Sequence, residues 1–108
     1  MKVQQQGQAL RLRIDEAELA RLLAGEVVEN ATRWPDGRVQ TQRVGLAAAT
    51  TWQRSDDGWC VQLPDAEVRA LASRLPSRDG LSFALHGLDL SFDVDVRDSA
   101  RRMQKDRH

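Results

Sequence analysis

The sequence predicts an α+β fold: a mostly antiparallel sheet of about six to seven strands with two short amphipathic helices on one face. Segments such as 88–96 alternate apolar and polar residues, which is the period of a half-buried strand. Two other segments place apolar residues at helical spacing. The chain has 108 residues, 41% hydrophobic and 30% charged, and we expect residues 1–98 to form one domain with a modest core.

A strand followed directly by a helix is expected near the start of the chain. Residues 10–14 alternate leucine or isoleucine with arginine and predict the strand. Asp15 is a suitable N-cap, and Glu18 completes a capping box with it. Gly25 can supply the left-handed conformation that ends a helix. The helix is therefore expected over 15–24.

Four strand segments follow, joined by two turns. The first turn contains Pro35-Asp36-Gly37, and the second has an Asp-Gly corner at 57–58. The strands are expected at 26–34, 38–46, 50–54 and 59–63.

A second helix and two final strands complete the pattern. Pro64 suits the start of a helix, and Pro76 is expected to end it. The two final segments, 81–85 and 88–96, both alternate, with a tight connection at His86-Gly87.

Two segments of the chain are also similar to each other in sequence. Residues 12–22 align with 61–71 when Ile14 is placed on Leu63, and both copies run from a strand into an acidic helix start. This indicates two β-α-β-β units, with the hairpin arm at Trp52 as an addition to the second. The alternative stays open, because any two strand-to-helix junctions look alike.

Five short segments in the first third of the chain form a recognisable pattern: Leu10–Arg13, Glu18-Leu19, Leu23–Gly25, Val28–Glu29 and Thr32-Arg33. This pattern resembles a family of small uncharacterised bacterial proteins. Members of that family open with a Met-Lys-Ile-Arg-Ile strand. The similarity continues through Val61–Pro64 and covers most of residues 1–98. Such relatives end near a Glu-Lys-Asp-aromatic stretch, whereas this chain has Arg97-Asp98-Ser99 without an aromatic residue. The resemblance implies a small α+β domain and implies no activity.

Most enzyme chemistry is disfavoured by what the sequence lacks. Neither glycine-rich nucleotide motif is present, and one cysteine with two histidines is too few ligands for a structural zinc site. His86 is expected in a turn and Cys60 in a strand, so neither is expected to react. No cofactor is expected.

The charges give two candidate ligand sites. Arg11 and Arg13 share a strand face, and with Arg33 on a neighbouring strand they would bind a small anion or nucleotide if the strands pair. Asp93 and Asp95 share another face and would suit a Mg²⁺-dependent enzyme. Ordinary solvated strand faces with cross-strand ion pairs are the competing interpretation of both sets.

Trp34 is a candidate contact for a partner because it lies beside the turn at 35–37. The zero net charge and the absence of tyrosine disfavour nucleic-acid binding, and no apolar segment is long enough for a membrane span. The basic segment 99–108 is expected to be a frayed tail. We therefore expect a non-enzymatic cytoplasmic module that binds a protein partner or a second copy of itself. The alternatives are an anion-binding module and a metal-dependent enzyme.

Overall fold

The computed structural model describes residues 1–77 and 79–96, and in these residues the chain forms eight strands and two helices. The α+β class is therefore confirmed. The helices are α1 (Glu16–Leu23) and α2 (Asp65–Ser73). The strands are β1 (Lys2–Gln6), β2 (Ala9–Asp15), β3 (Val28–Arg33), β4 (Val39–Ala47), β5 (Thr51–Ser55), β6 (Gly58–Pro64), β7 (Leu81–Leu85) and β8 (Leu88–Asp95). The tail predicted at 99–108 lies outside the described residues.

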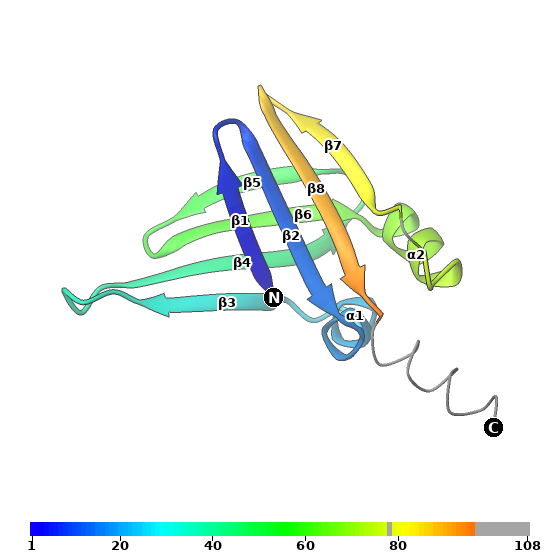
Figure 1. Cartoon of the computed structure of the whole chain (residues 1–108), viewed down its shortest axis with the longest axis horizontal. Helices are drawn as coiled ribbons and strands as arrows, with labels where there is room; N and C mark the ends of the chain where they lie inside the picture. The colour runs from blue at the N-terminus through cyan, green and yellow to red at the C-terminus, as the bar shows by residue number, and fades with distance from the viewer. Residues whose placement is uncertain (78, 97–108) are drawn as a thin grey trace.

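The strands form two sheets of four, so the prediction of a single sheet of six to seven strands is wrong. One sheet has the order β1-β2-β8-β7 and the other β3-β4-β6-β5. The central pair of each sheet, β2 with β8 and β4 with β6, is parallel, and the outer pairs are antiparallel. Figure 1 shows the strands of the first sheet crossing those of the second at a large angle.

The core lies between the two sheets. Alternation turns one side of each strand inward, so that Leu12 and Phe92 of one sheet join Val44 and Val61 of the other in one buried cluster. Apolar residues of both helices extend the same cluster, namely Leu19, Leu22, Val68 and Leu71. The core therefore holds both sheets and both helices together.

The sequence suggested that both helices lie on one face of a sheet, and this prediction is wrong. Helix α1 contacts strands β2 and β8 of the first sheet and β3 and β4 of the second, and α2 contacts β6 and β7. Each helix thus packs where the two sheets meet, as Figure 1 shows. The physical reason is that one apolar stripe per helix can be buried at the side of a sandwich as well as on a sheet face.

The residues that were predicted to begin and end the first helix, and to begin the second, lie at those helix ends. The Asp15 carboxylate accepts from the Glu18 N–H at 2.7 Å, and the Glu18 side chain accepts from the Asp15 N–H, which is a complete capping box. Gly25, with φ of +94°, follows the helix in the left-handed region. Helix α2 begins after Pro64, which makes no side-chain capping bond.

The order of elements repeats along the chain. A hairpin, a helix and a hairpin occur in the first half (β1, β2, α1, β3, β4) and again in the second half (β5, β6, α2, β7, β8). The leading hairpins β1–β2 and β5–β6 match in strand lengths, five and seven residues in each. Strand β1 is therefore the counterpart of β5, which the sequence had suggested was an addition. The hairpins pair across the halves: each sheet contains one hairpin from each half.

Candidate functional site

The first candidate site lies on the outer face of the β1-β2-β8-β7 sheet. Strand β2 buries Leu12 and turns Arg11 and Arg13 to the opposite side. In the ladder with β1, Arg13 is opposite Lys2 and Arg11 is opposite Gln4. Side chains directly opposite in a ladder lie on the same face, so four side chains that carry hydrogen-bond donors gather there.

The two arginines differ in their partners. Arg11 Nε donates to Asp93 Oδ2 at 2.9 Å, across the parallel β2–β8 pair. Arg13 forms no ion pair with any residue in 1–77 or 79–96, and its Nε is buried without an acceptor. A buried donor without an acceptor costs about 1–3 kcal/mol. The described fold therefore leaves the Nε–H of Arg13 without a hydrogen-bond acceptor.

Two hollows adjoin this arginine pair. The donor hollow is about 110 Å³ and is lined by Lys2, Gln4, Arg11 and Arg13. A larger cleft of about 450 Å³ lies on the other side, where acidic residues of β8 and Asp79 join the two arginines. The donor hollow is the smaller of the two, and no carboxylate lines it.

Arg33 does not join Arg11 and Arg13. It lies on β3, which pairs with β4 in the other sheet, whereas β2 pairs with β1 and β8. The strand pairing on which a three-arginine cluster depended is therefore absent from the described sheets. Lys2 and Gln4 occupy the neighbouring positions instead, and no sequence pattern had singled them out.

The acidic pair Asp93 and Asp95 lines the larger cleft. The Asp93 carboxylate is held by Arg11, and it also lies directly against Gly80. In residues 1–77 and 79–96 no group of three or more histidine, cysteine or acidic side chains is arranged to hold a metal ion. The geometry of Asp93 thus suits an ion pair within the sheet better than a metal ligand.

Trp34 lies at the end of the β3–β4 hairpin. Figure 1 shows this hairpin extending past the strands of the other sheet. The Trp34 side chain is 49% exposed, and its indole Nε1 donates to Gln40 Oε1 at 3.3 Å. Val39, also near the hairpin end, is 43% exposed. The hairpin end therefore carries apolar surface that the rest of the described chain does not cover.

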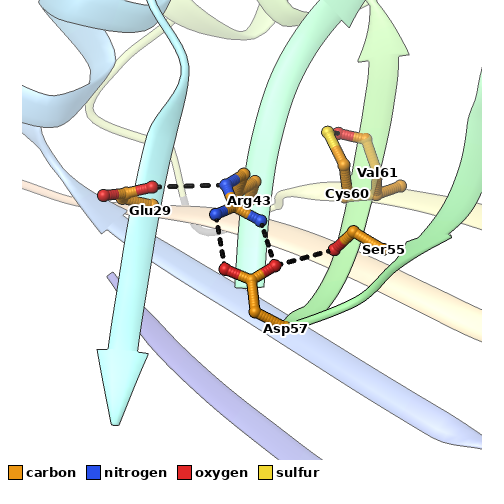
Figure 2. Close-up of polar contacts among 6 residues, drawn as sticks. All are labelled: Glu29, Arg43, Ser55, Asp57, Cys60 and Val61. Atoms are coloured by element: carbon orange, nitrogen blue, oxygen red, sulfur yellow. Dashed lines mark hydrogen bonds and ion pairs between the residues drawn. The ribbon is translucent and has the colours of Figure 1, made fainter. Parts of the chain in front are cut away.

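A second polar cluster lies on the other sheet and is centred on Arg43 (Figure 2). The Arg43 guanidinium makes two hydrogen bonds, of 3.0 and 2.8 Å, to the carboxylate of Asp57 in the β5–β6 turn. Its Nε lies 3.3 Å from Glu29 Oε2 on β3, and Ser55 donates to Asp57. The cluster therefore connects β3, β4 and the β5–β6 turn, and it has no free cation to offer a ligand.

The pKa of Asp57 is held well below its usual range, first by the hydrogen bonds from Arg43 and then by the one from Ser55. A carboxylate whose pKa falls on folding adds stability at pH values above its usual pKa near 4, and this stability is lost as the pH drops below that value. We expect chemical denaturation to show a smaller loss of stability between pH 5 and pH 3 in Asp57→Asn than in the wild type.

Asp56→Asn is the matched control for this pH experiment. Asp56 is the neighbour of Asp57 in the same turn and forms no ion pair within the described part of the chain. Its variant should keep the pH dependence of the wild type. Equal pH profiles for Asp57→Asn and the wild type would contradict the assignment of the ion pair.

Cys60 lies beside this cluster, on the strand β6 where the sequence placed it, and outside the core. It alternates with buried Trp59 and Val61, so it points to the outer face, half-buried. Burial raises the pKa of the Cys60 thiol, and the nearby Arg43 charge opposes this effect in part. The raised pKa keeps the thiol protonated near neutral pH.

Comparisons with family models and with curated proteins find no match to this chain. Neither helix in the described residues is long and apolar enough to cross a membrane. The candidate function therefore depends on the geometry of the sites themselves.

Proposed function

We propose that the protein is a small-anion-binding module whose site is the donor hollow formed by Lys2, Gln4, Arg11 and Arg13. The observation that carries the proposal is the Arg13 guanidinium, which has a buried Nε and no acceptor within the described fold. Structural arginines are ordinarily paired, as Arg11 and Arg43 are here. An arginine without a partner in residues 1–77 and 79–96, opposite Lys2, is suited to accept a bound anion as its partner.

The chemistry of the hollow indicates the class of ligand. Lys2 and the two arginines offer positive charge, and Gln4 offers an amide donor. Phosphate and carboxylate match such donors, because their oxygens accept charge-assisted hydrogen bonds in forked geometry. A volume of about 110 Å³ suits a phosphate group or a carboxylate and is too small to enclose a whole nucleotide. The ligand is therefore a compact anion or the anionic end of a larger molecule.

The test is isothermal titration calorimetry with inorganic phosphate at constant ionic strength. We expect saturable binding by the wild type and at least about tenfold weaker binding by Arg13→Gln, because a hydrogen bond to a charged group contributes about 1.5–3 kcal/mol. Arg33→Gln is the matched control, since Arg33 lies on the other sheet. It should bind phosphate like the wild type.

Stability without phosphate gives an independent readout for the same variant. Arg13→Gln removes a buried donor that has no partner, so it should leave the phosphate-free protein as stable as the wild type or slightly more stable. Phosphate at ten times its Kd should stabilise only the proteins that bind it, by about 1.4 kcal/mol. The proposal is refuted if phosphate does not bind, or if Arg13→Gln and Arg33→Gln weaken its binding equally.

A second candidate function, self-association, is favoured by the exposed end of the β3–β4 hairpin. Strand β3 is an edge of its sheet, and Trp34 and Val39 leave apolar surface beside it. Two copies can pair such edges antiparallel about a two-fold axis, which makes the contact self-complementary. We propose a second copy of this chain as the partner.

Sedimentation velocity tests this second function. We expect a dimer whose dissociation constant rises at least about tenfold in Trp34→Ser, because an aromatic anchor at an interface often contributes about 2 kcal/mol or more. Trp34 is about half exposed, so the variant should remain folded. A strict monomer at all protein concentrations would rule out self-association and leave the anion site unaffected.

A further inference from the structure

A groove lies between residues of the two sheets, and its chemistry differs from that of the donor hollow. It is about 330 Å³ and is bordered by Trp52, Arg54 and Trp59 of the second sheet. The first sheet contributes the opposite side, where Gly7 and Ala9 are small and Leu10 and Leu88 are apolar. We call this feature the aromatic groove.

The groove exists because β5 is an edge strand whose inner face is incompletely covered. Trp52 is opposite Val61, and Arg54 is opposite Trp59, so both side chains face the inside of the sandwich. Val61 is fully buried, yet Trp52 is 37% exposed. Gly7 lines the same groove, and a Cβ there would meet no atom within 4 Å, so the groove is open beside this residue.

Arg54 gives the groove a positive charge. Its guanidinium carbon lies 5.1 Å from the centre of the Trp52 ring, within the range of a cation–π contact. Within residues 1–77 and 79–96, Arg54 forms no ion pair, so its charge has no acidic partner there. An indole with an unpaired guanidinium over its ring matches a flat ligand that carries an anionic group.

We propose that the aromatic groove binds a planar aromatic carboxylate, with the ring against Trp52 and the carboxylate on Arg54. The small residues of the opposite wall leave room for a ring of indole size, and the volume lies within the range of small-molecule sites. Aromatic rings prefer offset stacking or edge-to-face contact with such an indole. This site is separate from the anion site proposed above, and either can fail without the other.

The test uses three probes that separate the ring from the charge: indole-3-acetate, indole-3-acetamide and acetate. Calorimetry measures binding, and ¹H–¹⁵N spectra of the labelled protein follow the indole N–H of Trp52. We expect indole-3-acetate to bind and to shift this signal. The acetamide should bind at least about tenfold more weakly, and acetate should not shift the signal, because the groove requires both ring and charge.

Three variants complete the design. Trp52→Leu should abolish binding, and Arg54→Gln should remove the preference for the acid over the amide. Gln53→Ala is the matched control, because Gln53 lies between them on β5 and faces the opposite side. It should bind like the wild type. The proposal is overturned if indole-3-acetate does not bind at 10 mM. This concentration would saturate a site whose dissociation constant for indole-3-acetate is about 0.1 mM. It is also overturned if Arg54→Gln still prefers indole-3-acetate to indole-3-acetamide. The same holds if Gln53→Ala weakens the binding of indole-3-acetate as much as Trp52→Leu does.

Discussion

Phe92→Ala is expected to destabilise the protein by about 3–5 kcal/mol, the usual cost of truncating a fully buried aromatic side chain. Phe92 is 0% exposed and is the largest of the fully buried side chains. It lies on β8, at the centre of the first sheet, paired with Leu12 on β2. Removing the ring leaves a cavity between the two sheets. Since whole domains have only about 5–15 kcal/mol of stability, equilibrium denaturation should detect the loss clearly.

Phe83→Ala is the matched control for this truncation. Phe83 is only half-buried on the edge strand β7, so the same chemical change removes less apolar contact. Its destabilisation should be clearly smaller than that of Phe92→Ala. If Phe92→Ala is too unstable to purify, Phe92→Leu should retain the fold and give an intermediate loss. Equal losses at the two positions would contradict the placement of the core between the sheets.

Gly58→Ala is expected to destabilise the protein by roughly 3 kcal/mol, the upper end of the usual cost of overpacking. A Cβ at position 58 would overlap the backbone carbonyl of Thr41 on the neighbouring strand. Gly58 is paired with Thr41 at the start of the parallel β4–β6 ladder, and the Thr41 N–H donates to Asp57 O at 2.7 Å. Backbone cannot move aside as a flexible side chain can, so the ladder and the turn must both shift.

Gly45→Ala tests whether this effect is specific. Gly45 is on β4 in the same sheet, and a Cβ there would meet Val27 Cγ2 at 3.6 Å, an ordinary contact. We expect a stability change within about 1 kcal/mol, because alanine fits this backbone and restricts the unfolded chain. Thermal and chemical denaturation of the two variants measure the difference. A Gly58→Ala variant as stable as Gly45→Ala would show that the β4–β6 register is different from the one described.

Local patterns predicted the elements well because their causes are local. The capping box at Asp15 depends on residues three apart, and the alternation in 88–96 describes one strand. Strand β1 was not predicted by alternation, because its residues 4–6 are all glutamine. Its structure depends on the ladder that it forms with β2, which no local pattern encodes.

For a related reason, the order of the strands within the sheets could not be predicted from the sequence. Alternation tells which face of a strand is apolar, but it does not tell which strand lies beside it. The hairpins pair across the two halves of the chain, so β2 has β8 as its neighbour and β3 has no contact with β2 in the ladder. This is why Arg33 was grouped with Arg11 and Arg13 and why Lys2 was overlooked. The shared face of Arg11 and Arg13 was predicted correctly, since it follows from the strand period alone.

The Arg13 side chain offers the most direct test of the proposed anion site. Its guanidinium Nε–H signal can be followed by NMR while inorganic phosphate is added at constant ionic strength, with the Arg33 signal as an internal reference. We predict a saturable change at Arg13, with backbone changes centred on Lys2, Gln4 and Arg11, and no saturable change at Arg33. An Arg13 signal that stays constant, or that moves only in step with Arg33, would contradict the assignment of this site.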